Sequence, residues 1–166
     1  MCEGLSHPSL ERTNRFYDPE GDPRYVPGIA SLAAEFAQYL RGLGDTSEFR
    51  LNAEALARDG FGPRPAFDGI VAEMAGAVVG YLLYHDGYDT DAAVRLLMVV
   101  DLFVTPAVRG QGIGAALMRE AKAIAASREA KLLAWTVYRK NTDALRFYER
   151  IGGRYVEDLH LMAMDV

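Results

Sequence analysis

Apolar residues recur at helical spacing in several segments of the chain. The first such segment begins near Pro27, a residue that suits a first helical turn, and ends at Gly42 and Gly44. Polar side chains occupy its other side, so the pattern predicts an amphipathic helix. A shorter helix is predicted to follow, with Asn52 as its N-cap and Gly60 as its stop. The apolar positions of the first helix are Ile29, Leu32, Ala33, Phe36, Leu40 and Leu43.

The C-terminal half predicts two more helices. One follows a glycine-rich stretch and ends near Arg128. The last begins at an N-cap, Asn141 or Thr142, and stops at the pair Gly152-Gly153. The apolar face of the first of these helices consists of Ile113, Leu117, Met118, Ala121 and Ile124. The positions expected to point inward from the last helix are Ala144, Leu145, Tyr148 and Ile151.

Runs of branched and aromatic residues predict the strands. Residues 66–86 favour two strands around a turn at Met74 to Gly76. The run Val94 to Val104 predicts a central strand buried on both faces, and Lys131 to Val137 predicts another buried strand. A short first strand is predicted at Arg15 to Pro19.

The segment after Gly153 predicts one or two closing strands. The expected order is β-α-α-β-β-β-α-β-α-β, a mixed α/β fold. We expect residues 1–20 to form a loose extension and residues 21–166 to form one domain.

The composition and net charge of the chain limit the kinds of molecule that it is expected to bind. The 166 residues carry 18 Lys+Arg against 23 Asp+Glu, a formal charge of -5, which disfavours nucleic acid and anionic membranes. No apolar run approaches the roughly 18 residues of a membrane span, and the N-terminus does not have the pattern of a signal peptide. Cys2 is the only cysteine, so no disulfide can form within the chain, and a cytoplasmic location is expected. The scattered His7, His85 and His160 argue against a metal site.

The stretch VRGQGIGAAL, Val108 to Leu117, places three glycines between a strand and a helix. The first amides of a helix have no partner inside it, and its dipole favours negative charge there. Glycine lets a phosphate approach the backbone closely. The segment Arg109 to Ala115 therefore predicts a pyrophosphate cradle, with Arg109 as a candidate additional cation.

Two other interpretations of this stretch remain open at this point. The glycines could serve only a tight turn that needs positive φ. The spacing Gly110-x-Gly112-x-x-Ala115 also matches a dinucleotide-binding fingerprint, although too little chain follows for two nucleotide-binding halves. A Walker A loop is excluded, because no Gly-Lys-Ser/Thr follows.

Two motifs in order resemble the GCN5-related N-acetyltransferase (GNAT) family. Arg109 to Gly114 is similar to its R/Q-x-x-G-x-G/A signature, and Asn141 to Arg154 is similar to its N-x-x-A-x-x-F-Y-x-x-x-G segment. Ala55 to Glu73 and Val100 to Leu117 resemble the diamine and polyamine branch, which includes lysine-analogue acetyltransferases. In that branch the strand begins with Glu, where this chain has Val100.

The resemblance implies an acyltransferase that moves an acetyl group from acetyl-coenzyme A to a primary amine of a small diamine, polyamine or lysine-like molecule. It implies a mixed, mostly antiparallel sheet of six to seven strands with about four helices, splayed at the central strands, and a homodimer. The alternatives are a coenzyme A-binding sensor or scaffold without turnover and a protein N-acetyltransferase.

The resemblance also implies roles for individual residues. The backbone of the strand end would pair with the pantetheine arm, and the glycine stretch would hold the pyrophosphate. Tyr148 would protonate the departing thiolate; its alternative role is a core aromatic. Asn141 would bind pantetheine or serve only as an N-cap. The implied coenzyme contacts are Leu102, Phe103, Val104, Arg109, Gly110, Gln111, Gly112, Ile113, Gly114, Ala115, Asn141, Ala144, Phe147 and Tyr148.

A primary amine near neutral pH is mostly protonated, so an acetyltransferase must remove a proton from it. Asp101, acting through water, is a candidate, as are Glu73 and His85; Asp101 could instead be a structural carboxylate. Tyr81, Tyr84 and Tyr88 could line an acceptor pocket or fill a strand face. Without a glutamate at Val100, we expect long polyamines to be poor acceptors.

Overall fold

The computed structural model describes residues 12–15, 23–156 and 161–164. The chain divides into two compact units, Met1–Thr136 and Val137–Val166, and each is described by itself. Most of the strand predicted at Arg15 to Pro19 lies outside the described residues. Part of the expected loose extension is ordered, because Arg12–Arg15 forms strand β1.

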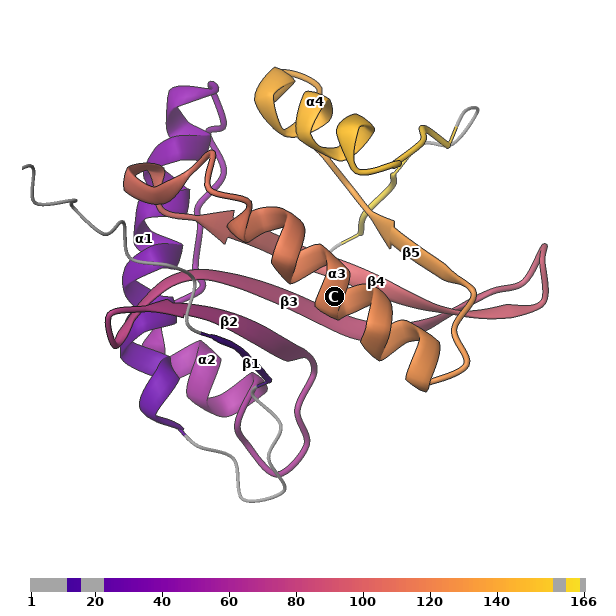
Figure 1. Ribbon diagram of the computed structural model, residues 1–166, viewed down its shortest axis with the longest axis horizontal. Helices are drawn as coiled ribbons and strands as arrows, with labels where there is room; N and C mark the ends of the chain where they lie inside the picture. The colour runs from indigo at the N-terminus through magenta and orange to yellow at the C-terminus, as the bar shows by residue number, and fades with distance from the viewer. Residues whose placement is uncertain (1–11, 16–22, 157–160, 165–166) are drawn as a thin grey trace, which may run out of the picture. The chain divides into compact units, whose positions relative to one another are not determined.

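Five strands of the first unit form one sheet in the order β1-β2-β3-β4-β5 (Figure 1). After β1 come β2 (Asp68–Met74), β3 (Ala77–Asp89), β4 (Val94–Val104) and β5 (Leu132–Trp135). Neighbouring strands are antiparallel from β1 to β4, whereas β5 runs parallel to β4. A mixed, mostly antiparallel sheet is therefore confirmed, but the described residues supply five strands and not the predicted six to seven.

Three helices of the first unit begin and end close to their predicted positions. They are α1 (Val26–Gly42), α2 (Ala53–Asp59) and α3 (Ile113–Ser127), with single 3-10 turns at Pro23–Tyr25 and Pro106–Val108. The Asn52 side chain accepts a hydrogen bond from the Ala55 amide and caps α2, as predicted. No helix in the described part of the chain has the length and apolarity that a membrane crossing needs.

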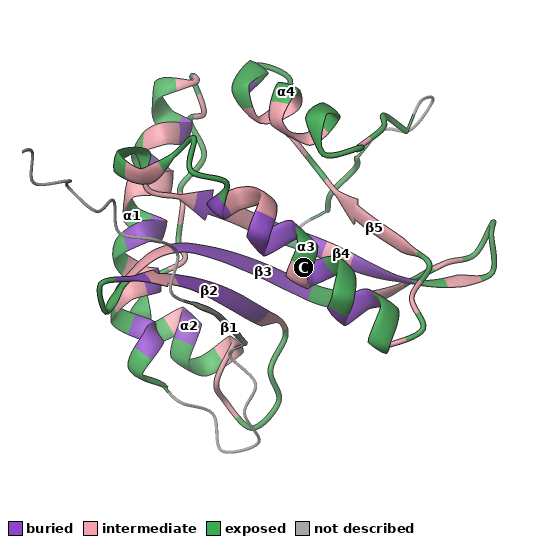
Figure 2. Ribbon diagram, in the orientation of Figure 1, coloured by how far each residue is buried: buried purple, intermediate pink, exposed green. Residues whose placement is uncertain are grey.

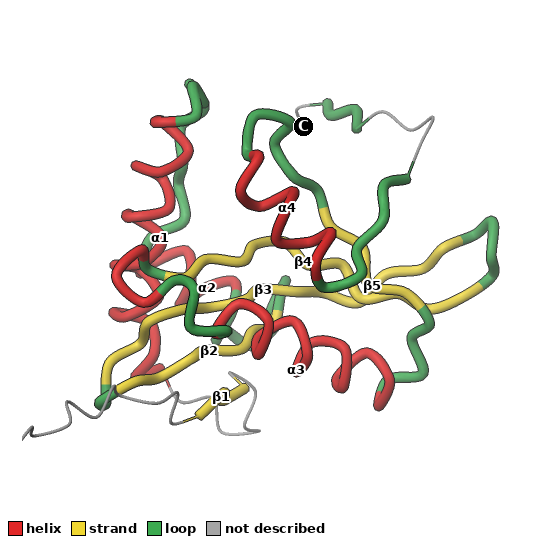
Figure 3. Tube along the Cα trace, turned by 45° about the horizontal axis from the view of Figure 1, so that its top comes forward, coloured by secondary structure: helices red, strands yellow, loops and turns green. Residues whose placement is uncertain are grey.

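Helices α1 and α2 cover one face of the sheet, and α3 covers the other (Figure 3). Tyr81 and Leu83 of β3 belong to one buried cluster with Ile29 and Leu32 of α1. Side chains alternate along a strand, so Gly80 faces the other way, and a Cβ built there would lie 3.4 Å from Leu117 of α3. Residues of both faces of β2 and β3 are buried (Figure 2).

Strands β4 and β5 are paired along only part of β4. β5 pairs with β4 only from Leu96 to Val99. In the pairing with β3, Val99 opposes Tyr84 and Asp101 opposes Leu83, so Val100 is the extra residue of a β-bulge. Val100 is 54% exposed, so the prediction that this strand is buried on both faces is wrong at its C-terminal half.

The second unit contains helix α4 (Thr142–Arg150). Asn141 is its N-cap, and the turn after it includes Gly152 with φ +90, as the sequence predicts. Ile151 is 38% exposed, so the prediction that it points inward is wrong. Residues 154–156 and 161–164 are in no strand, so the predicted closing strands are absent from the described part of this unit.

Candidate active site

The glycine stretch forms a turn that leads directly from β4 into α3. Gly110 has φ +80 and Gly112, the N-cap of α3, has φ +82, so both occupy the left-handed region that favours glycine. The tight-turn interpretation therefore holds for two of the three glycines. It does not exclude a cradle, because both glycines are exposed and α3 begins at Ile113 with its first amides unbonded inside the helix.

The Arg109 side chain folds back over the end of β4. Its Nε donates a 2.9 Å hydrogen bond to the carbonyl of Val104. Its guanidinium carbon lies 4.9 Å from the ring centroid of Tyr39 and 5.3 Å from that of Phe103. Arg109 therefore connects α1, β4 and the glycine stretch. The sequence had predicted instead that Arg109 could be an additional cation for a phosphate.

The end of β4 has backbone groups that point away from β3. The Thr105 amide donates to the Val79 carbonyl at 3.0 Å, so in the alternating antiparallel ladder Phe103 also turns its backbone groups to β3. Leu102 and Val104 then turn theirs to the edge that β5 does not cover. Of the three residues predicted to pair with pantetheine, Leu102 and Val104 therefore turn their backbone groups to this edge, whereas the backbone of Phe103 belongs to the sheet. At this edge the Val104 carbonyl already accepts the bond from Arg109, and the Leu102 amide bonds the Asp101 carboxylate.

Asp101 immediately precedes that edge and is held by a buried tyrosine. The Tyr81 hydroxyl donates to Oδ2 of Asp101 at 2.6 Å. Burial raises the pKa of Asp101 to about 7, and the hydrogen bonds from Tyr81 and the Leu102 amide act in the opposite direction. Burial, with the nearby Asp101 charge, raises the pKa of Tyr81 and keeps the phenol protonated. The residue as a whole is partly exposed, whereas its carboxyl group is buried enough to take a proton near neutral pH.

The other two candidate bases lie elsewhere on the sheet. Glu73 opposes Val78, five residues along β3 from the partner of Asp101, or about 16 Å at strand spacing. It accepts a hydrogen bond from the Tyr25 hydroxyl at 3.3 Å. His85 is exposed, and its Nδ1 lies 2.9 Å from the Asp86 carbonyl oxygen. Asp101 is therefore the candidate that combines partial burial with a position beside the open edge.

The three tyrosines considered for an acceptor pocket do not share one. Tyr81 faces α1, whereas Tyr84 faces the side of α3 and donates to Asp68 at 2.8 Å. Tyr88 is 60% exposed. The alternative interpretation, that Tyr81 and Tyr84 fill strand faces, is the one that the structure supports.

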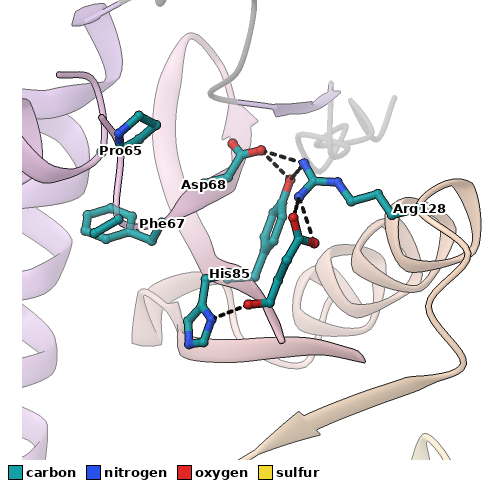
Figure 4. Close-up of a pocket in the computed structure, with 9 residues that line it drawn as sticks. Pro65, Phe67, Asp68, His85 and Arg128 are labelled. Atoms are coloured by element: carbon teal, nitrogen blue, oxygen red, sulfur yellow. Dashed lines mark hydrogen bonds and ion pairs between the residues drawn. The ribbon is translucent and has the colours of Figure 1, made fainter. Parts of the chain in front are cut away.

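A separate hollow of about 240 Å³ lies between the loop before β2 and the end of α3 (Figure 4). Arg128 extends into it and bonds to Asp68 at 3.0 Å and to Asp86 at 3.1 Å. Pro65, Phe67 and His85 also line it. Its charged side chains pair with one another, so the hollow joins α3 to β2 and β3, and Asp101 does not line it.

Helix α4 carries the predicted residues of the second unit. Oδ1 of Asn141 accepts from the Ala144 amide at 3.2 Å, which is the N-cap interpretation of this residue. The rings of Phe147 and Tyr148 lie 5.0 Å apart between centroids, and both side chains, like Ala144, are half-buried. The predicted spacing from Ala144 to Tyr148 is one helical turn on one face.

The residues at the end of β4 and at the start of α3 fit a coenzyme A thioester. Exposed positive-φ glycines and the first amides of α3 suit a pyrophosphate, and the edge at Leu102 and Val104 suits the pantetheine amides. Among the described residues no cluster of three or more His, Cys, Asp or Glu side chains could hold a metal ion.

Sequence reasoning missed the residues that support this site from a distance in the chain. Tyr39 lies under Arg109, and the Thr105 hydroxyl donates to Glu35 at 2.8 Å, so α1 holds both ends of the segment that enters the loop. These contacts join residues some 70 positions apart. The only signal in the sequence was the helical spacing of α1, which does not specify its partners.

Comparison with known proteins agrees with this geometry. The profile of the acetyltransferase (GNAT) family matches residues 29–153. A thialysine N-epsilon-acetyltransferase from Bos taurus is 33% identical over 143 residues, which cover 81% of this chain and 80% of that protein. A spermidine/spermine N(1)-acetyltransferase-like protein 1 from Homo sapiens is 30% identical over 90% of this chain, but this region is 21% of that protein.

Several solved structures have the same fold as this chain. An integron cassette protein from the mobile metagenome of V. cholerae has a TM-score of 0.76 at 22% identity, covering 93% of this chain and 92% of that one. A ribosomal-protein-alanine N-acetyltransferase from Brucella melitensis has a TM-score of 0.72 at 21% identity, covering 92% of this chain and 99% of that one. The chain belongs to the acetyltransferase (GNAT) family and is an acyltransferase enzyme.

Proposed function

We propose that the protein transfers an acetyl group from acetyl-coenzyme A to a primary amine of a small molecule. The acceptor class we propose is a lysine-like compound, a diamine or a short polyamine. One observation carries the proposal: Asp101, whose pKa is raised to about 7, directly precedes the part of β4, from Leu102 on, that does not pair with β5. A proton acceptor thus adjoins the backbone that would bind the thioester arm.

The acceptor class rests on charge and on relatives. A carboxylate beside aromatic rings favours a cationic amine, and the rings of Phe103 in β4 and Phe36 in α1 lie 5.3 Å apart, tilted by 44°. The net charge of the chain is -5. The related thialysine enzymes act, by their name, on a side-chain amine of a lysine analogue.

The chemistry follows from the residues. Acetyl-coenzyme A would supply the acetyl group as a thioester. The amine has an ordinary pKa of about 10.4 and arrives protonated; Asp101 would accept that proton, directly or through one water, and free the nitrogen lone pair for attack on the carbonyl carbon. Tyr148 would donate its proton to sulfur as the carbon–sulfur bond breaks, and the second proton that the nitrogen loses on becoming an amide would restore the phenol. The amides of Gly112 to Ala115 would hold the pyrophosphate.

Thiol release from acetyl-coenzyme A tests this proposal. We expect release to depend on an added small primary amine and to match the amount of acetylated amine formed. Coenzyme binding without amine-dependent release would favour the sensor or scaffold alternative. Release only with folded proteins or peptides as acceptors would favour a protein N-acetyltransferase.

A cytoplasmic location and a homodimer also remain proposals. They rest on the single cysteine and on the frequency of two-fold dimers among oligomers. Light scattering at micromolar concentration is expected to give twice the mass of one chain.

A further inference from the structure

The hydrogen bond between Tyr81 and Asp101 joins neighbouring strands across one face of the sheet. Tyr81 opposes Phe103 and Asp101 opposes Leu83, so the two side chains are diagonal neighbours. The oxygen–oxygen distance of 2.6 Å is in the range of hydrogen bonds from a hydroxyl to an ionised carboxylate. The contact therefore suits the charged form of Asp101.

The tyrosine has little freedom to move. Tyr81 is fully buried, and its ring lies 6.4 Å from that of Phe103, within the cluster that α1 and α2 cover. Asp101 is partly exposed. Tyr81 therefore holds the Asp101 carboxylate through Oδ2, and the Leu102 amide also donates a hydrogen bond to this carboxylate.

Other ionisable groups on this face of the sheet are directed elsewhere. On α1, Glu35 accepts a hydrogen bond from Thr105. On β2, Glu73 accepts one from Tyr25, and on β3 the exposed His85 contacts the Asp86 carbonyl. Burial raises the pKa of Asp101, and the hydrogen bonds from Tyr81 and the Leu102 amide lower it.

We propose that Tyr81 is a positioning residue that fixes the Asp101 carboxylate through its Oδ2 and stabilises its ionised form. Tyr81 does not contact the substrate; it acts through Asp101. The proposal rests on the proposed function, in which Asp101 accepts the proton of the amine. In that reaction the N–H bond of the ammonium breaks, an O–H bond forms on Asp101, and Tyr81 keeps its own proton throughout.

The test is Tyr81→Phe, which keeps the ring and removes the hydroxyl. Tyr84→Phe is the matched control, because Tyr84 is equally buried and loses a hydroxyl bond to Asp68 on the opposite face. The readouts are kcat/KM against pH and the titration of the Asp101 carboxyl carbon by NMR in protein labelled with ¹³C-aspartate. Thermal unfolding checks that both variants fold.

We expect Tyr81→Phe to raise the midpoint of the acid limb by roughly one pH unit, because a hydrogen bond to the anion is lost. The NMR titration should move by the same amount, and Tyr84→Phe should move neither. If Tyr81→Phe does not fold, site-specific difluorotyrosine at position 81 has a more acidic phenol and should lower both midpoints.

Two results would overturn the proposal. An unchanged NMR titration would mean that Tyr81 does not stabilise the carboxylate. A shifted titration with an unchanged rate profile would mean that Asp101 is not the proton acceptor in catalysis. Failure of the proposed function itself looks different, because the wild-type protein would then turn over no small amine, while the NMR titration would still report on the contact.

Discussion

The guanidinium of Arg109 lies over the ring of Tyr39, 4.9 Å from its centroid, and in this way the start of the glycine stretch is anchored to α1. The Nε bond to Val104 fixes the same side chain to the end of β4. Both contacts depend on the planar, forked guanidinium and not on charge alone. Arg109 is thus placed to set the position of the loop.

We therefore expect Arg109→Lys and Arg109→Met to weaken coenzyme A binding by similar factors, about five- to tenfold each, because both lose the Nε bond. Calorimetry with coenzyme A measures the affinities. If Arg109 instead contacts a phosphate as a cation, lysine would retain most of the affinity and only methionine would lose it.

Gly112 should be required both for the turn and for the ligand. Gly112→Ala places a side chain at φ +82, which costs about 1–2 kcal/mol of stability, and its methyl group would obstruct a phosphate. Gly112→Val should weaken coenzyme A binding more than tenfold. The measurements are thermal unfolding and calorimetry.

Gly76 offers a matched control for this experiment. It has φ +74, and like Gly112 it has no atom within 4 Å of an added Cβ, but it lies in the turn between β2 and β3. Gly76→Ala should lose similar stability and keep coenzyme affinity. Equal affinity losses in the two variants would assign the effect to folding alone.

Asp101→Asn should increase stability at alkaline pH while it lowers activity. The folded-state pKa of about 7 lies above the ordinary value of 3.8, so the folded protein binds more protons between these values. The contribution of Asp101 to the stability of the wild-type protein must then fall as pH rises from about 4 to 7. Asparagine removes this ionisation, and the gain at pH 8 should be roughly 2–4 kcal/mol.

Denaturant unfolding at pH 4 and at pH 8 measures this effect. The variant and the wild-type protein should differ little at pH 4, where the folded wild-type carboxyl is already neutral. A stability difference between the variant and the wild-type protein that does not grow from pH 4 to pH 8 would show that Asp101 has an ordinary pKa.

Val100→Glu should improve the use of long polyamines. Val100 is exposed at the bulge beside Asp101, so a glutamate can be accommodated without burial. An added carboxylate near the attacked amine is worth about 1 kcal/mol in attraction, or a severalfold rise in kcat/KM for spermine. Val100→Gln, of the same shape without the charge, should give no rise; an equal rise would point to an effect of size.

Tyr148→Phe should keep the affinity for coenzyme A and lower kcat by about 10²–10⁴-fold, because general acid assistance to the departing sulfur is lost. Single-turnover kinetics and calorimetry separate the two effects. Phe147→Leu, on the same helix, keeps the phenol and is a control for packing. Parent rates in Tyr148→Phe would mean that water or another group protonates the thiolate.

The sequence predicted the helices and the main strands of the first unit because their signals are local. Asn52 and Gly60 marked the ends of α2, and the turn at Gly76 separated β2 from β3, as found. The bulge at Val100 was not predicted, since a run of apolar residues carries no signal for one inserted residue. The exposure of Ile151 was missed because helical spacing defines a face without naming what covers it.

The site was predicted less completely than the fold. Motif spacing identified the strand end, the glycine stretch and α4. The folded-back position of Arg109 and the bond from Tyr81 to Asp101 arise from contacts between different elements. The pattern of residue types along the chain does not specify which side chains of different elements meet. The same is true of Glu35 and Thr105, which α1 and β4 bring together.

The most direct test of the central claim is a competition among acceptors in one mixture. Purified protein would receive acetyl-coenzyme A with equal concentrations of thialysine, lysine, putrescine, spermine and an unacetylated peptide, and mass spectrometry would quantify each acetylated product. The account predicts that the small amines gain one acetyl group at a primary amine, and that spermine and the peptide gain little. Acetylation of the peptide alone, or of no acceptor while coenzyme A still binds, would contradict it.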